Sequence, residues 1–144
     1  MSTIIVGVDG SETAAQAARS AAILAVALGA DLHVVSAFSH YEEKVYDVGP
    51  GEHYVVSTRD SAEALAQDVV KELRGDYPDL KIVAEAEAGK PADALVAAAE
   101  LTQAELIVIG NKRVQGVSRI MGSVAVDVVR KAPCDVYIAH THPR

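Results

Sequence analysis

The residues best suited to chemistry lie in one glycine-rich segment, GNKRVQGVSRIMGS at positions 110–123. Its glycines, Gly110, Gly116 and Gly122, let the backbone approach a ligand closely. Ser123 can cap the helix expected to begin near Val124, and the N–H groups and dipole of that helix start favour an anion. The segment also has three basic residues and no acidic one: Lys112, Arg113 and Arg119. This combination predicts a phosphate cradle, although glycines and a capping serine are also common in loops that bind nothing.

A second candidate follows the first apolar run, in Val8-Asp9-Gly10-Ser11. Gly10 permits a tight turn, and Ser11 is a natural N-cap for the helix that follows. Asp9 stands at the expected strand end, where its carboxylate could accept hydrogen bonds from a ligand hydroxyl or help to hold a divalent cation beside phosphates. The alternative is that Asp9 only orders the turn.

Other nucleotide-binding motifs do not fit. No G-x-x-x-x-G-K-[ST] loop occurs, since Gly89-Lys90 is followed by Pro91 and has no glycine five places earlier. A dinucleotide fingerprint would need G-x-G-x-x-G after the first strand, where this chain has Gly7-Val8-Asp9-Gly10. A phosphate-loop kinase and an NAD-binding protein are therefore disfavoured.

Metal and nucleophile chemistry have no sequence support either. Ser123 has no histidine base in its motif, and Cys134 beside Pro133 precedes a strand, so we expect it to be a small core residue. The histidines lack zinc-ligand spacing with a cysteine pair, and we expect all five to be solvated: His33, His40, His53, His140 and His142.

Short apolar runs alternate with segments of helical period. Five continuous runs predict strands covered on both faces: residues 4–8, 32–35, 82–84, 106–109 and 136–139. Apolar stripes between them predict helices, the first running from Ala14 to Leu28 and ended by Gly29, the third having Pro91 in its first turn. This alternation predicts a doubly wound, Rossmann-like α/β fold with a five-stranded parallel sheet. Ser39 to Ser57 is expected to be a long irregular excursion, either a mobile loop or a lid over a ligand.

Composition limits the partners. The chain has 144 residues, 50% of them hydrophobic, which is enough for one domain over residues 1–144. Its 13 basic and 20 acidic residues give a net charge of −7, and it has no Trp and one Phe, so nucleic acid and membrane surfaces are disfavoured. The single cysteine and the beginning MSTIIVGVDG, which lacks the character of a secretion signal, predict a cytoplasmic location.

The chain resembles the universal stress protein family over nearly its whole length. The resemblance rests on IIVGVDGS, on the turn from Glu87 to Pro91, on LIVIGN, on GVSRIMGS and on KAPCDVYIAH, which occur in the family's order. ATP-binding members share a pattern of Gly, two residues, Gly, nine residues, Gly and then Ser or Thr. Gly110, Gly122 and Ser123 match its ends, but Arg113 replaces the middle glycine and the loop is one residue short.

The resemblance implies a strand order of 3-2-1-4-5 and a set of ligand contacts. Asp9 would lie near the ribose or a bound cation, and the terminal Gly-Ser pair would hold phosphate oxygens. Together with the residues singled out from the sequence itself, such as Lys112 and Arg113, the expected nucleotide-binding residues are Val8, Asp9, Ser11, Val35, Ser36, Ala37, Gly89, Ile109, Gly110, Asn111, Lys112, Arg113, Gly122, Ser123 and Val124.

These observations predict a nucleotide-binding regulatory protein of the stress response rather than an enzyme. The expected ligand is ATP with Mg²⁺, with AMP or cyclic AMP as alternatives. A member of the same fold that binds no nucleotide is the second hypothesis, and a slow ATPase is the third. The apolar last strand, Val136 to Ala139, predicts a homodimer joined at the sheet edge, in agreement with the resemblance.

Overall fold

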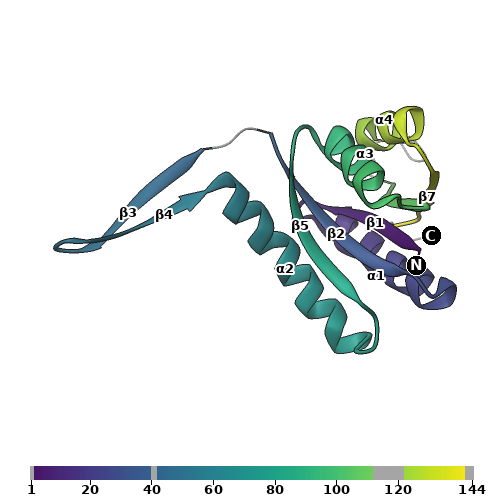
Figure 1. Ribbon diagram of the computed structural model, residues 1–144, viewed down its shortest axis with the longest axis horizontal. Coiled ribbons are helices and arrows are strands. Elements are labelled where there is room, and N and C mark those ends of the chain that lie inside the picture. Colours follow the sequence, from purple (N-terminus) through teal and green to yellow (C-terminus); the bar gives the residue numbers. More distant parts are fainter. Residues whose placement is uncertain (1, 40–41, 112–121, 142–144) are drawn as a thin grey trace.

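A computed structural model describes residues 2–39, 42–111 and 122–141, and gives only the backbone for residues 44, 46–48 and 52–56. Its main sheet has five parallel strands in the spatial order β5-β2-β1-β6-β7 (Figure 1). In chain order they are β1 (Thr3–Val8), β2 (Asp31–Phe38), β5 (Ile82–Ala88), β6 (Leu106–Gly110) and β7 (Asp135–Ala139). Counted along this sheet the order is 3-2-1-4-5, which confirms the predicted fold.

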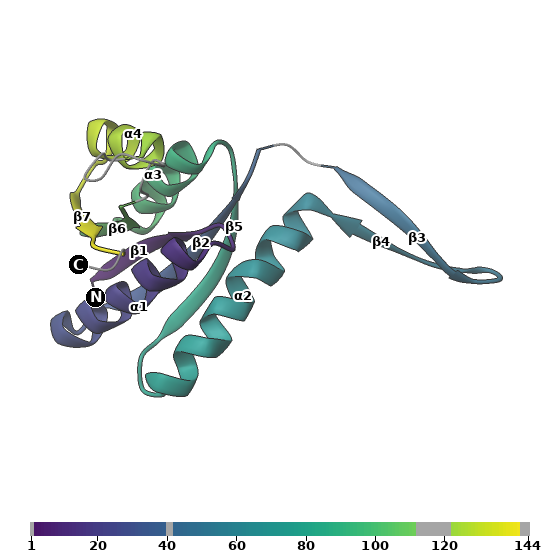
Figure 2. The same cartoon turned by 180° about the vertical axis from the view of Figure 1, so that it is seen from behind.

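Four helices cover the two faces of the sheet (Figures 1 and 2). They are α1 (Glu12–Leu28), α2 (Thr58–Asp76), α3 (Pro91–Thr102) and α4 (Ser123–Lys131). On β1, Ile4 and Val6 pack into the core with α1 and α2, whereas Ile5 between them packs into the core with α3 and α4. All three are fully buried, which explains why the strand is a continuous apolar run.

Two helix ends lie where the capping residues predict them, and the start of α4 does not. Gly29 ends α1 in the left-handed conformation at φ 65°, and Pro91 begins α3. Leu28, predicted on the buried stripe of α1, is 55% exposed at the last position of the helix. The prediction that Ser123 caps α4 is wrong: Gly122 is the N-cap, and Ser123 is the first helical residue.

The expectation of an irregular excursion between Ser39 and Ser57 is also wrong. Most of this segment is an antiparallel hairpin of β3 (Glu43–Gly49) and β4 (Glu52–Ser57). Pro50 and Gly51 form its two-residue turn, with Gly51 at φ 74°. The hairpin projects away from the α/β body at the N-terminal end of α2 (Figures 1 and 2). The sequence shows no period-two alternation of apolar and polar residues in β3, because apolar and charged residues occur on each side of its pleat.

No helix within the described part of the chain is long and apolar enough to cross a membrane.

Candidate functional site

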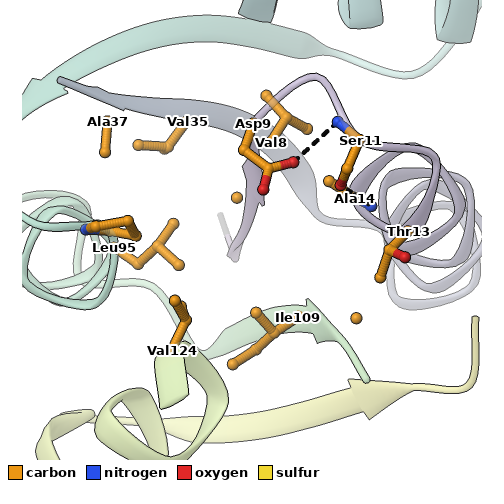
Figure 3. Close-up of a pocket in the computed structure, with 13 residues that line it drawn as sticks. Val8, Asp9, Ser11, Thr13, Ala14, Val35, Ala37, Leu95, Ile109 and Val124 are labelled. Atoms are coloured by element: carbon orange, nitrogen blue, oxygen red, sulfur yellow. Dashed lines mark hydrogen bonds between the residues drawn. The ribbon is translucent and has the colours of Figure 1, made fainter. Parts of the chain in front are cut away.

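A cavity of about 170 Å³ opens at the carboxyl ends of the central strands (Figure 3). It lies where β1 and β6 meet, the point at which the sheet changes winding direction and where α/β sheets bind ligands. The described residues that line it come from β1 and the turn after it, from β2 and β6, and from the N-terminal parts of α1, α3 and α4. They are Gly7, Val8, Asp9, Ser11, Thr13, Ala14, Val35, Ala37, Pro91, Leu95, Ile109, Gly110 and Val124.

One side of the cavity is apolar. Val35 and Ala37 of β2 face it together with Leu95 of α3, and Ile109 and Val124 close it from β6 and α4 (Figure 3). A cavity side lined by aliphatic side chains favours an uncharged, apolar ligand group such as a ring.

Gly7 shapes the floor of this apolar side. A β-carbon at this position would lie 3.0 Å from both Cδ1 and Cδ2 of Leu95, a tighter approach than side chains ordinarily make. The missing side chain therefore lets Leu95, which is 4% exposed, lie directly on β1.

The other side of the cavity is polar and is formed by the turn after β1. The carboxylate Oδ1 of Asp9 accepts a hydrogen bond of 2.9 Å from the backbone N–H of Ser11 (Figure 3). The hydroxyl Oγ of Ser11 in turn accepts one of 3.1 Å from the N–H of Ala14, which confirms Ser11 as the N-cap of α1. Gly10, at φ 87°, provides the turn. Asp9 thus does order the turn, as one of the two interpretations expected, while its side chain also lines the cavity.

The carboxyl end of β6 is packed closely against other parts of the chain. A β-carbon on Gly110 would lie 2.8 Å from Cγ2 of Thr13, 3.1 Å from the Thr13 carbonyl oxygen and 3.1 Å from Cγ2 of Thr141. Glycine is needed here because α1 and the segment after β7 both approach the strand closely. This requirement holds whether or not a ligand also approaches the strand.

Asn111 connects the ends of β6 and β7. Its Oδ1 accepts hydrogen bonds from the backbone N–H of Thr141 at 2.8 Å and from the Thr141 hydroxyl at 2.9 Å. Its own N–H donates to the carbonyl of Ala139 at 3.0 Å. Thr141 is 8% exposed, so these bonds satisfy polar groups that are largely shielded from water.

Comparison with known proteins identifies the family. Residues 1–140 match the model of the universal stress protein family. A universal stress protein of Mycobacterium tuberculosis is 33% identical over 142 residues, which cover 96% of this chain and 96% of that protein. The chain belongs to the universal stress protein family.

Two solved universal stress protein structures have the same fold and contain nucleotides. One, a complex with cAMP, has a TM-score of 0.74 and 27% identity, and the match covers 98% of each chain. Another, from Archaeoglobus fulgidus in complex with dAMP, has a TM-score of 0.68 and 29% identity over 96% of this chain and 97% of that one.

The cavity brings together eight of the fifteen expected nucleotide-binding residues: Val8, Asp9, Ser11, Val35, Ala37, Ile109, Gly110 and Val124. Gly122 and Ser123 lie at the start of α4, next to Val124, and the N-cap residue has no side-chain acceptor for the first-turn N–H groups. Lys112 and Arg113 lie outside the described residues, as do Gly116 and Arg119.

Three further residues of that set do not line the cavity. Ser36 is 3% exposed and alternates with Val35 and Ala37, so it faces the opposite side of the sheet. Gly89 lies at φ 123°, a conformation that favours glycine, and its N–H donates to the Phe38 carbonyl at 2.9 Å. The side-chain oxygen of Asn111 accepts hydrogen bonds from Thr141 instead.

Sequence reasoning missed five lining residues: Gly7, Thr13, Ala14, Pro91 and Leu95. Pro91 was predicted only as part of the first turn of the third helix, and a spacing of four residues places Leu95 on the same face of that helix. Doubly wound folds bring the first turns of helices to the strand ends, and this general rule could have suggested Thr13 and Pro91.

The expectation that all five histidines are solvated is wrong for His33. His33 has a side chain only 16% exposed, and its Nδ1 contacts a carboxylate oxygen of Glu85 on β5. It is not solvated because both faces of β2 are covered and the neighbouring strand offers a polar partner. His140 is exposed, whereas His40 and His142 lie outside the described residues, and the structure gives only the backbone of His53.

Cys134 packs against the core on the α3 and α4 side, as expected for a small core residue. Burial, and to a smaller extent the charge of Asp135, raise the pKa of its thiol. A raised pKa keeps the thiol protonated near neutral pH, so it is a poor nucleophile. Among the described residues, no group of three His, Cys, Asp or Glu side chains could hold a metal ion by itself.

Proposed function

We propose that this universal stress protein binds an adenine nucleotide and acts as a regulatory module of the stress response. ATP is the ligand that we propose first. The observation that carries the proposal is the two-sided cavity: aliphatic side chains on one side, and the polar turn after β1 on the other. The related structures in complex with cAMP and dAMP support the class of ligand. AMP and cyclic AMP remain alternatives to ATP at the same site.

The proposed orientation follows from the chemistry of the walls. The purine lies between Val35, Ala37 and Ile109, where a flat apolar ring loses water favourably. The ribose lies beside Asp9, whose carboxylate accepts hydrogen bonds from hydroxyl groups. The phosphates extend toward the start of α4, where the N–H groups of the first turn and the helix dipole favour anions.

The basic residues of the segment after β6 complete the proposed phosphate site. Lys112 and Arg113 follow the described end of β6, and the guanidinium of Arg113 has donors in a planar fork suited to phosphate oxygens. In this proposal Arg113 replaces the backbone contacts that the family's middle glycine would allow. Mg²⁺ fits here as an ion bound by the phosphates, water and the single carboxylate of Asp9, which is its usual coordination in nucleotide sites.

We propose binding without catalysis. Only three polar side chains line the described cavity, those of Asp9, Ser11 and Thr13, and two of them take part in the turn that starts α1. Asp9 with a cation could still orient a water molecule, and single-turnover hydrolysis by the purified protein would detect a slow ATPase.

Titration calorimetry with ATP, cyclic AMP, AMP and adenosine tests the site. Ala37→Leu, which fills the apolar side, should weaken all four ligands at least tenfold, whereas Ala27→Leu on the exposed face of α1 should leave them unchanged. Arg113→Ala should weaken ATP about ten- to a hundredfold, equivalent to about 1.5–3 kcal/mol, and adenosine little. The absence of binding at millimolar nucleotide would favour the second hypothesis, a member of this fold that binds no nucleotide.

We also propose a cytoplasmic homodimer joined through β7, formed by residues 1–144 as one domain and without nucleic acid or membrane partners. β7 lies at the edge of the main sheet, and Tyr137 on it is 45% exposed. Tyr137→Lys should lower the mass measured by sedimentation.

A further inference from the structure

Hydrogen bonds fix the base of the β3–β4 hairpin, where it joins the start of α2. At the base, the N–H of Thr58 donates to the Glu42 carbonyl at 2.8 Å, and the N–H of Glu42 donates to the Thr58 hydroxyl at 3.0 Å. Ser57, 4% exposed, forms a capping box with Asp60 that joins β4 directly to α2. These bonds determine the direction in which the hairpin leaves the body.

Beyond its base the hairpin stands apart from the rest of the described structure (Figures 1 and 2). The described residues that line the cavity all come from other elements, and the hairpin points away from the α/β body (Figures 1 and 2). Val45, in the middle of β3, is 61% exposed. An isolated two-stranded ribbon is at best marginally stable in water, so a hairpin of this length needs a further surface to pair with.

The two outer edges of the hairpin differ in how well they could accept another strand. β3 contains Glu43, Lys44 and Asp47, and its register against β4 shifts between Asp47 and Gly49, where it has one extra residue. Charges and bulges are the features by which proteins protect an edge strand from pairing. From His53 to Ser57, β4 contains no Asp, Glu, Lys or Arg, and its residues are mostly aromatic or β-branched.

The hydrogen-bond pattern shows which backbone groups of β4 face outward. Glu42 and Thr58 form a hydrogen-bonded pair, and such pairs alternate with non-hydrogen-bonded ones along an antiparallel ladder. Val45 and Val55, opposite each other in the register, are therefore a non-hydrogen-bonded pair. The N–H and C=O of Val55 point to the outer edge of β4, and those of Val45 point to the outer edge of β3. The same alternation turns the N–H of Ser57 outward, where it reaches Oδ2 of Asp60.

We propose that the outer edge of β4 pairs antiparallel with the β4 edge of a second copy of this chain, so that two hairpins form a four-stranded sheet. A second copy is the occupant because a regular strand segment without Asp, Glu, Lys or Arg, here His53 to Ser57, is complementary to itself about a two-fold axis. The acidic character of β3 then faces away from the junction on both sides, which avoids like-charge contact at the new ladder. From His53 to Ser57, β4 offers no Asp, Glu, Lys or Arg with which a charged peptide strand could form an ion pair.

This interface is separate from the one proposed at β7. The hairpin leaves the molecule beyond the β5 and β2 side, whereas β7 is the strand at the opposite edge of the sheet (Figure 1). Two different two-fold interfaces on one chain close into a tetramer or continue as a filament. Pairing through β4 therefore predicts a particle at least twice the mass of the one that forms without it.

Matched proline variants test the proposal. Val55→Pro removes one outward N–H from β4, and Val45→Pro removes the equivalent N–H from β3; neither removes a donor from the β3–β4 ladder. Sedimentation velocity and native mass spectrometry of the full chain at micromolar concentration should show that Val55→Pro has half the wild-type mass or less, and that Val45→Pro keeps the wild-type mass. Both measurements are made with and without ATP, because the pairing needs no nucleotide.

Val55→Lys and Val45→Lys form a second matched pair in case proline disturbs the hairpin, and circular dichroism checks that each variant is folded. Only the β4 variant should lower the mass, since a lysine at an unpaired edge is tolerated. A monomeric wild-type protein would overturn the proposal. So would unchanged masses of both β4 variants, or equal losses in the β3 and β4 variants.

Discussion

At the β1 end of the cavity the chain is held by its own neighbouring side chains, whereas at the β6 end it is held by residues 30 positions away in sequence. Asp9 and Ser11 accept hydrogen bonds from backbone groups two and three residues ahead. Asn111, in contrast, accepts hydrogen bonds from Thr141, beyond the last strand.

The two ends of the cavity should therefore respond differently to substitution. A local turn can be weakened without moving the rest of the sheet, because its bonds begin and end within one helical turn. The β6 end joins three elements, since Gly110 is packed between Thr13 of α1 and Thr141. A change there should disturb the cavity wall, the start of α1 and the end of β7 together.

The largest effect is expected at Gly110. In Gly110→Ala the new β-carbon would lie 2.8 Å from Cγ2 of Thr13 and 3.1 Å from its carbonyl oxygen, so Thr13 or the strand must shift. We expect a loss of about 1–3 kcal/mol in the free energy of unfolding, measured by urea denaturation. Gly75→Ala is the matched control: this glycine of α2 has nothing within 4 Å of the added carbon, and the substitution should stabilise the helix by about 0.5–1 kcal/mol. Equal effects of the two substitutions would mean that the β6 end is not closely packed.

The next effect is expected at Asn111. Asn111→Ala leaves the N–H and hydroxyl of Thr141 without their common acceptor in a position that is 8% exposed. The cost should be about 1–3 kcal/mol by the same measurement. His140→Ala is the control, since this exposed side chain meets Asn111 only through a contact of 3.4 Å, and its removal should change stability by less than about 0.5 kcal/mol. A smaller loss in Asn111→Ala than in His140→Ala would contradict the long-range connection.

The same contrast explains what could be predicted from sequence. The strands, the helices, the capping by Ser11 and the left-handed Gly29 depend on residues close together in the chain, so periodicity and turn chemistry predict them. The strand order came from the family resemblance, and the structure confirms it.

Contacts between distant segments could not be predicted in the same way. Nothing near His33 indicates Glu85, and nothing near Asn111 indicates Thr141, because each pair meets only through the parallel sheet. The hairpin was missed for a different reason: it projects from the α/β body (Figure 1), and a strand pair outside the layered core has no helix-covered face to impose an alternation of apolar and polar residues. The role of Gly7 depends on Leu95, which reaches β1 only after α3 has packed on the sheet.

The smallest effect is expected at Ser11, and it tests whether the β1 end is as local as its hydrogen bonds indicate. Ser11→Ala removes the acceptor of the Ala14 N–H at the start of α1, and loss of such an N-cap costs about 1 kcal/mol. Ser11→Asp should recover most of this loss, because a carboxylate can accept the same bond and is favoured by the helix dipole. Hydrogen exchange should show faster exchange in the first turn of α1 and unchanged protection in β6 and β7, since opening of a local turn does not need the sheet to separate. Gly110→Ala should instead raise exchange in all three elements. If Ser11→Ala also loosens β7, the turn and the long-range connection act as one unit, and the contrast between the two ends of the cavity fails.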